Sequence, residues 1–433
     1  MIPMRTHRHL FRSSLALAAA VLGHFAAYAD DWPQWRGSNR EGVWKETDAL
    51  QTFPADSLPI RWRVPCGNGW SSPVIANGRV SLLDAVLESP KATERIRAFD
   101  AATGQELWKY EYEAKYPEWA FDPTQMMGPY STTVADSGRV YSLGAIGQLH
   151  CLDAAGGHVV WSKDLTQEYQ CESFSGCCPS PIIEGDLLIV VVGGKPDACI
   201  IAFDNTTGKE VWKALSDTWT YSSPIIITAN GKRQLIEWTQ GGVNSLDPAT
   251  GAVYWRLPLV TSGDTTVPTP VRQGDHLLVS GLMLKLDPDR PAAEFDWPAR
   301  RTVSNRTLSN TSTPVIQGDY VYSAKVGGLL VCLDARTGQQ VWETDKVTDL
   351  AGGAAIHITL NGDSALLFND RGELIRAKLT PEGYQELSRT RLIEPTFPFG
   401  GRNITWSAPS YANGHVFVRN HKELLCVSLE PTQ

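Results

Sequence analysis

The sequence has few of the patterns by which enzymes are usually recognised. It has nine histidines among 433 residues, and it contains neither a His-Glu-x-x-His metal motif nor a Cys-x-x-Cys-His haem attachment site. Gly-x-Ser-x-Gly, a phosphate-binding loop and the glycine motif of dinucleotide-binding proteins are missing too. These absences exclude the enzyme classes that short motifs identify.

Positive charge and long apolar runs are also scarce. Lys and Arg number 39 against 47 Asp and Glu, a formal net charge of −8, which disfavours binding to nucleic acid or to an anionic membrane. Residues 1–29 resemble a secretory signal, with three arginines, the apolar run Leu15–Ala27 and a cleavage site after Ala29. That run is too short to span a bilayer. We therefore expect an exported protein, periplasmic or extracellular, without a transmembrane segment, and without a lipid anchor because no cysteine follows Ala29 directly.

The sequence does contain a repeated unit. An Asp is followed by Thr-Gly three and four residues later and by Trp eight residues later, at Asp100/Thr103/Gly104/Trp108, Asp204/Thr207/Gly208/Trp212, Asp247/Thr250/Gly251/Trp255 and Asp334/Thr337/Gly338/Trp342. A fifth copy, Asp153/Gly156/Gly157/Trp161, lacks the Thr. Asp and Thr can bond the turn backbone and Gly can adopt a positive φ, so each copy predicts a hairpin. Isolated hairpins are marginally stable, and these must stack on one another.

A second element precedes each hairpin: small residues, usually with Pro, then an apolar strand, Gly and another strand. It occurs at 71–80, 131–141, 179–190, 222–236, 268–279, 312–322, 355–368 and 407–418. The eighth copy lacks an outer strand, which residues 60–64 around Trp62 would supply. We therefore predict an all-β fold, an eight-bladed β-propeller of four-stranded blades closed by this N-terminal strand. The domain would span 60–433, after the signal peptide (1–29) and a lead-in segment (30–59).

The Asp-x-x-Thr-Gly-x-x-x-Trp unit in an eight-bladed array resembles the PQQ-like propeller superfamily, which includes quinoprotein alcohol dehydrogenases and the BamB outer-membrane assembly factor. The opening Asp31–Gly37 is similar to the start of exported bacterial PQQ-like proteins without assigned activity. The resemblance implies that the repeated tryptophans dock between blades as structural residues. They are Trp62, Trp108, Trp161, Trp212, Trp255 and Trp342.

The innermost strands suggest a ligand site. One and two residues before the repeated Pro, side chains are nearly always small, because eight strands converge there and bulky groups would collide. Three residues before it, consecutive blades carry Trp406, Trp70, Tyr130, Cys178 and Tyr221, with Cys177 adjacent. This aromatic arc at the funnel mouth would suit a planar or sugar-like ligand or an apolar peptide. Alternatively, the rings only fill the funnel and pack the blade tops.

The eight cysteines fall into two groups. Cys151, Cys332 and Cys426 share one repeat position and Cys199 lies in a similar apolar strand, so we expect buried core residues there. The remaining four, Cys66, Cys171, Cys177 and Cys178, are disulfide candidates. The adjacent pair Cys177-Cys178 resembles the disulfide that covers the quinone in quinoprotein alcohol dehydrogenases. A bond from Cys171 to either of them is the alternative.

Three functions remain open. We favour a BamB-like, non-catalytic binding or scaffold protein of the cell envelope, a monomer without a cofactor, whose partner is an envelope protein or a small extracellular ligand. The alternative is a PQQ- and Ca²⁺-dependent alcohol dehydrogenase, which needs a carboxylate base, oxygen ligands for Ca²⁺ and a basic group. Candidates near blade junctions are Glu172, Asp217, Glu237, Arg301, Asn310, Arg402 and Asn403. Carbohydrate binding by Trp70, Trp406 and Tyr221 is a third possibility.

Overall fold

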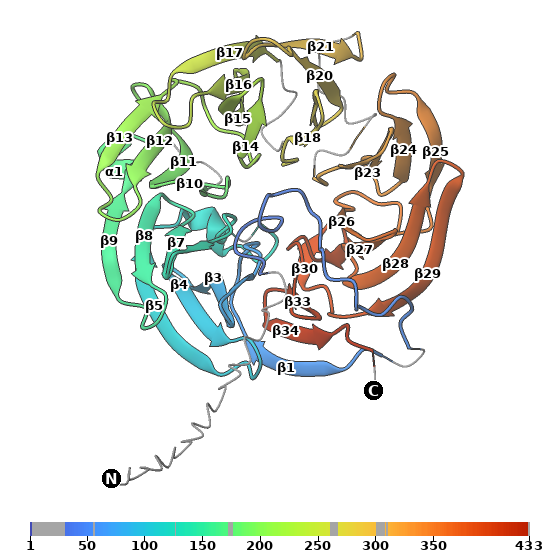
Figure 1. The fold of residues 1–433 in the computed structure, drawn as a ribbon. Helices are drawn as coiled ribbons and strands as arrows, with labels where there is room; N and C mark the ends of the chain where they lie inside the picture. The colour runs from blue at the N-terminus through green and yellow to red at the C-terminus, as the bar shows by residue number, and fades with distance from the viewer. Residues whose placement is uncertain are drawn as a thin grey trace.

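The computed structural model describes residues 1, 31–54, 57–125, 127–171, 176–259, 267–299, 308 and 311–431. The predicted signal peptide lies outside this part of the chain except for Met1. Eight four-stranded sheets form a closed ring, which confirms the predicted eight-bladed β-propeller (Figure 1). Within the described ranges, no helix is long and apolar enough to cross a membrane.

In the first seven blades the chain runs from the innermost strand outward. Blades 1 to 4 comprise β2 (Val74–Ala76), β3 (Arg79–Glu88), β4 (Lys91–Asp100), β5 (Glu106–Ala114); β6 (Val134–Asp136), β7 (Arg139–Leu143), β8 (Gln148–Asp153), β9 (Val159–Asp164); β10 (Ile182–Glu184), β11 (Leu187–Gly194), β12 (Ala198–Asp204), β13 (Glu210–Ala214); and β14 (Ile225–Ala229), β15 (Lys232–Thr239), β16 (Gly242–Leu246), β17 (Val253–Pro258). The 3₁₀ helix η1 (Glu118–Phe121) and the short helix α1 (Leu165–Tyr169) lie between blades.

Blades 5 to 7 repeat this pattern, and blade 8 departs from it. They comprise β18 (Val271–Gln273), β19 (His276–Val279), β20 (Leu282–Leu286), β21 (Ala293–Trp297); β22 (Val315–Gln317), β23 (Tyr320–Ala324), β24 (Leu330–Asp334), β25 (Gln340–Thr344); and β26 (Ile356–Asn361), β27 (Ser364–Asn369), β28 (Glu373–Thr380), β29 (Gly383–Arg391). A separate hairpin, β30 (Phe397–Phe399) and β31 (Arg402–Ile404), precedes blade 8, which comprises β32 (Ser410–Ala412), β33 (His415–Arg419), β34 (Glu423–Ser428) and β1 (Ile60–Pro65).

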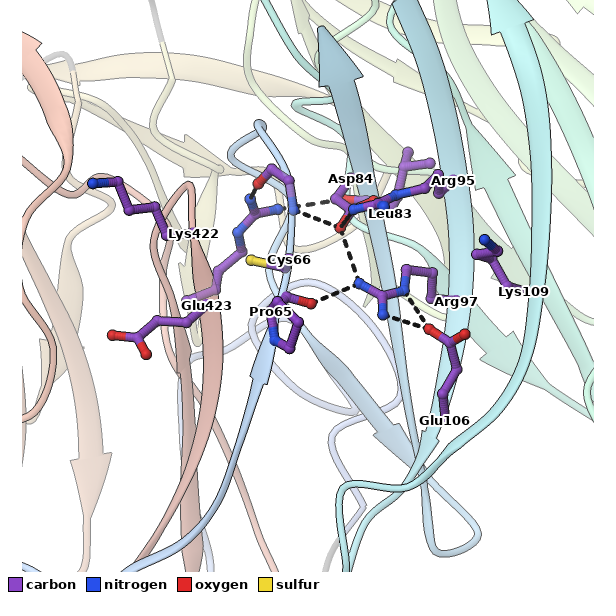
Figure 2. Close-up of polar contacts among 12 residues, drawn as sticks. Pro65, Cys66, Leu83, Asp84, Arg95, Arg97, Glu106, Lys109, Lys422 and Glu423 are labelled. Atoms are coloured by element: carbon purple, nitrogen blue, oxygen red, sulfur yellow. Dashed lines mark hydrogen bonds and ion pairs between the residues drawn. The ribbon is translucent and has the colours of Figure 1, made fainter.

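The N-terminal strand closes the ring as predicted. β1 pairs antiparallel with β34, with Trp62 opposite Cys426, so blade 8 is built from both ends of the chain. Figure 2 shows a polar contact that joins this strand to blade 1: Arg97 donates to the carbonyl of Pro65 (2.8 Å). Within blade 1, Arg97 also donates to Glu106 (2.7 Å) and lies 3.5 Å from the buried Asp84. Asp84 also accepts two hydrogen bonds from Arg95. These charges are paired, which offsets the cost of burying Asp84.

The repeated tryptophans lie between neighbouring blades. Trp62 donates from Nε1 to the carbonyl of Ala101 in the next blade (2.9 Å), and a Cβ on Gly104 would lie 2.7 Å from its ring. The turn glycine therefore leaves the space that the indole occupies. Five of the six predicted tryptophans bond the residue after the turn position of the next blade in this way: Trp62, Trp108, Trp161, Trp212 and Trp342.

Blade 5 departs from this pattern at its junction with blade 4 and keeps it at its junction with blade 6. Its turn has no glycine, and Trp255 of blade 4 donates instead to Gln234 of its own blade (3.2 Å). Trp297, which we did not include among the docking residues, bonds the carbonyl of Ala335 (2.8 Å) and covers Gly338. Trp297 lies ten residues after Asp287 instead of eight, so it did not match the repeat.

The small residues at the centre do more than avoid collision. Their hydroxyls accept hydrogen bonds from the backbone of the preceding blade: Ser72 N–H donates to Thr132 (3.1 Å), Thr132 N–H to Ser180 (3.0 Å) and Ser180 N–H to Ser223 (2.9 Å). Blades 5 and 6 repeat the contact from Thr269 to Thr313 (3.2 Å). Because these groups are buried, each bond satisfies an amide that would otherwise lack a partner.

The lead-in segment, to which the sequence assigned no role, crosses the middle of the ring (dark blue in Figure 1). Arg40 is buried and donates to the carbonyls of Ser180 (3.2 Å), Pro181 and Pro224 (2.8 Å) in blades 3 and 4. Burial lowers the pKa of Arg40 to about 9, so the guanidinium is charged at neutral pH. The segment thereby plugs the channel between the blades.

We predict that Thr132→Val destabilises the protein, because it leaves the Ser72 amide without an acceptor. The expected loss in the free energy of unfolding is about 1–3 kcal/mol, measured by urea denaturation. Thr132→Ser keeps the hydroxyl and should lose less. Equal losses in both variants would contradict a role for the hydroxyl.

Candidate functional site

The mouth of the channel at the N-terminal ends of the innermost strands forms a cup of about 630 Å³. Five of the six predicted ligand-site residues line it: Trp70, Tyr130, Cys178, Tyr221 and Trp406. Val267 and Thr311, which lie three residues before the repeated Pro in blades 5 and 6, line it too. We define these and the other lining residues described below as the aromatic cup. The structure thus brings together residues that are up to 336 positions apart in the chain.

The rings of the cup contact one another. Trp70 stacks on Tyr130, with centroids 4.7 Å apart and planes at 3°, and Tyr221 meets Tyr130 nearly at right angles (6.1 Å). Trp406 packs against Phe397 (5.5 Å) and donates from Nε1 to the carbonyl of Gly353 (2.7 Å). Offset and perpendicular ring pairs of this kind stabilise their own arrangement, so the cup is preformed.

The sequence reasoning missed several residues of the cup. Phe397 and Phe399 come from the β30–β31 hairpin, Trp119 from η1, and Trp35 from the lead-in segment. Trp35 donates to Thr269 (2.8 Å), which fixes it across the channel. None of these elements belongs to the repeat, so no alignment of blades could have found them. The recurrence of aromatic residues in 116–121 and 397–399 was the available signal.

The described wall of the cup carries no formal charge at neutral pH. It contains no Asp, Glu, Lys or Arg among the residues that the structure describes. His357 lies 2.8 Å from the carbonyl of Trp406, and burial lowers the pKa of this histidine to about 4, so it is neutral. Nearby His421 packs edge-to-face against Trp70, and burial lowers the pKa of His421 to about 3. The cup therefore favours uncharged, apolar ligands.

Comparison with known proteins identifies the family. A family model described as outer membrane protein assembly factor BamB matches residues 92–344 and 281–378. The chain belongs to this family. The BamB proteins of Moranella endobia (27% identity, 48% of this chain and 55% of that one) and Yersinia pestis (23% identity, 64% and 68%) are similar to it. The matched part thus spans about half of the Moranella protein.

Quinone-dependent dehydrogenases are also similar to this BamB-family chain. The quinone alcohol dehydrogenase subunit of Gluconobacter oxydans is 28% identical over 76% of this chain and 48% of that one. Among solved structures, BamB of Moraxella catarrhalis (16% identity, 87% of this chain and 99% of that one) has a TM-score of 0.57. Quinohemoprotein alcohol dehydrogenase of Comamonas testosteroni (14%, 94% and 82%) has 0.63. At these identities the structures show a shared fold alone.

The described wall of the cup does not fit PQQ, the cofactor that the family resemblance raises. PQQ carries three carboxylates, and the wall offers no Lys or Arg to them among the described residues. Nor does the described part of the chain contain a group of three or more His, Cys, Asp or Glu residues that could hold a metal ion. Glu172, Arg301 and Asn310, three of the candidates, lie outside the described residues.

The candidate dehydrogenase residues that the structure describes lie outside the cup and make other contacts. Asp217 pairs with Arg256 (2.7 Å), and Arg402 pairs with the buried Asp370. Asn403 lies on β31 and Glu237 is fully buried on β15. None of these residues lines the cup. The structure therefore does not bring the four described members of the predicted dehydrogenase set together at the cup.

The cysteines form no disulfide, and all eight lie within the described ranges. Cys177 does not line the cup but packs in a buried cluster with Cys171 between blades 2 and 3. Cys178 lines the cup, and its thiol donates to the carbonyl of Gly176 (3.2 Å). Burial raises the pKa of Cys178 well above its usual value, so this residue is a neutral thiol.

Glu237, between blades 3 and 4, is the least satisfied of the buried acids. Neither carboxylate oxygen has a hydrogen-bond partner in the described part of the chain. Burial raises the pKa of Glu237 well above its usual value, and the charge of Arg40 only partly opposes this. The folded protein consequently binds a proton at the Glu237 carboxylate more tightly than the unfolded chain does.

We predict that Glu237 makes the protein less stable as the pH rises. The stabilisation by its bound proton is complete below pH 4.5, the usual glutamate pKa, and should fall above it by up to about 1.4 kcal/mol per pH unit until the folded-state pKa is passed. Urea denaturation at several pH values measures this slope. Glu237→Gln should flatten it, whereas Glu184→Gln, at an accessible ion pair, should not. An unchanged slope in Glu237→Gln would contradict the assignment.

Proposed function

We propose that this BamB-family propeller is an exported, non-catalytic binding protein of the cell envelope that engages an apolar, ring-bearing segment of a partner protein in the aromatic cup. The observation that carries the proposal is the cup's wall, which combines aromatic rings from four blades and the β30–β31 hairpin with no charged side chain in its described part. Such a wall binds apolar groups, but it supplies no ionised acid or base for chemistry.

Two features favour a protein segment over a sugar. The faces of Trp70 and Tyr130 stack on each other, so these rings are not both free to stack on a flat sugar. Phe399 is 38% exposed at the rim although it is large and apolar. Exposed aromatic residues of this kind are typical of contact sites on proteins. The names of the BamB relatives, outer membrane protein assembly factors, agree with an envelope partner.

Photo-crosslinking tests the proposal. A benzoyl-phenylalanine at Phe399 should form a discrete adduct with one envelope protein in cells. Trp406→Ala in the same protein should weaken that adduct at least about fivefold, because it removes an anchor ring from the cup. The control position is Val211, which is 51% exposed on the outer strand β13 and far along the sheet from the cup.

Two kinds of result would contradict this proposal. If Phe399 and Val211 give the same adducts, or if Trp406→Ala leaves the adduct unchanged, the cup is not the contact site. Purified protein titrated with PQQ and Ca²⁺ provides the second arm. Saturable quenching of tryptophan fluorescence together with dye-linked alcohol oxidation would make the protein a dehydrogenase and overturn the proposal.

A further inference from the structure

The other end of the channel holds a second cavity, of about 640 Å³, which we call the edge pocket. The lead-in segment forms one side of it, through Gln34, Ser38 and Arg40. The innermost strands of blades 3, 4 and 5, β10, β14 and β18, form the other side. Because the plug separates the two cavities, the edge pocket is distinct from the aromatic cup.

The backbone of these strands is the chemically important part of the pocket. Each innermost strand joins its neighbour through a two-residue turn, with Glu184 opposite Leu187, Ala229 opposite Lys232 and Gln273 opposite His276. Those pairs exchange hydrogen bonds, so the preceding residue in each strand points its N–H and C=O away from the sheet, into the channel. These residues are Ile183, Thr228 and Arg272, and all three line the edge pocket.

The equivalent positions in three other blades already have a partner. In blade 1, Ile75 exchanges two backbone hydrogen bonds with Trp32 (2.9 and 3.0 Å), and in blade 2 Ala135 N–H donates to Pro33 (2.9 Å). In blade 7, Leu360 bonds Gly42 (2.9 Å) and Trp44 (2.8 Å). The lead-in segment thus occupies these inner edges on one half of the channel through short backbone contacts, with isolated β-bridges at Trp32–Ile75 and Val43–Leu360.

In blades 3, 4 and 5 the equivalent backbone groups are unpaired in the described chain. Within the described chain, no backbone hydrogen bond reaches Ile183, Thr228 or Arg272 from the channel side. Unpaired strand edges of this kind bind extended polypeptide by strand addition. Arg272 has no carboxylate partner among the described residues either, whereas Arg233 is paired with Glu184.

We propose that the edge pocket binds an extended segment of a partner protein, which pairs with the inner edge of β14 and places an acidic side chain against Arg272. It continues the interface that the lead-in segment makes with blades 1, 2 and 7. The alternating donors and acceptors of the strand edge specify a polypeptide backbone, and Arg272 favours an acidic side chain at the position beside it. This site acts independently of the aromatic cup.

The first test uses a fluorescein-labelled peptide of alternating Thr and Val with a central Asp, titrated with the full mature protein. Thr228→Pro removes the N–H that points into the channel but none that bonds β15, and it should weaken binding about tenfold or more. Thr228→Val keeps that N–H and removes only the hydroxyl, which accepts from Arg233 (3.0 Å), so it should bind as the unmodified protein does. Equal binding by the two variants would overturn the proposal.

Two further measurements hold even if the proline variant does not fold. The same peptide methylated on alternate amide nitrogens should lose binding about tenfold, because it cannot donate to the strand edge; unchanged binding would overturn strand addition. Arg272→Glu should weaken the Asp peptide and strengthen a matched Lys peptide, and an equal response to both would overturn the charge assignment. Trp406→Ala in the cup should leave both affinities unchanged, which separates this site from the proposed function.

Discussion

The contact between most of the repeated tryptophans and the turn of the next blade sets the geometry on which the other features depend. The indole occupies the space that a side chain on the turn glycine would fill, as Trp62 does against Gly104, and its N–H bonds the adjacent carbonyl. This contact fixes the distance and angle between successive sheets. Six of the eight junctions between neighbouring sheets carry this contact, and the eight sheets close into a ring. The blade built from both chain ends completes that closure, because β1 supplies the outer strand that follows β34 in blade 8.

Closure creates a central channel, and the lead-in segment divides it. Arg40 binds carbonyls of blades 3 and 4, while Trp35 reaches Thr269 in blade 5. On one side lies an uncharged aromatic cup, and on the other a polar pocket edged by unpaired backbone. The two ends of one channel therefore differ in chemistry. A binding protein with two such sites could hold separate segments of its partners.

The repeat allowed much of the candidate site to be predicted. Aligning the inner strands placed Trp70, Tyr130, Tyr221 and Trp406 on neighbouring blades, and the structure puts all four in one cavity. It also indicated small residues at the axis, but not that Thr132 and its equivalents link neighbouring blades by hydrogen bonds. The small size of these residues can be inferred from the convergence of eight strands alone. The hydrogen bond depends on how far adjacent innermost strands are offset from one another. Phe397 and Phe399 could not be placed, because an insertion outside the repeat has no register to align.

The sequence by itself determined the number of blades, their strand order and the strand that closes the ring, because each follows from a local pattern repeated at a regular spacing. Only the tertiary structure decided the path of residues 31–54 and the division of the channel. Those contacts join residues such as Arg40 and Pro224 that are 184 positions apart, and they depend on carbonyls that every residue possesses. A backbone acceptor leaves no signature in the side chains, so no reading of the sequence could have located it.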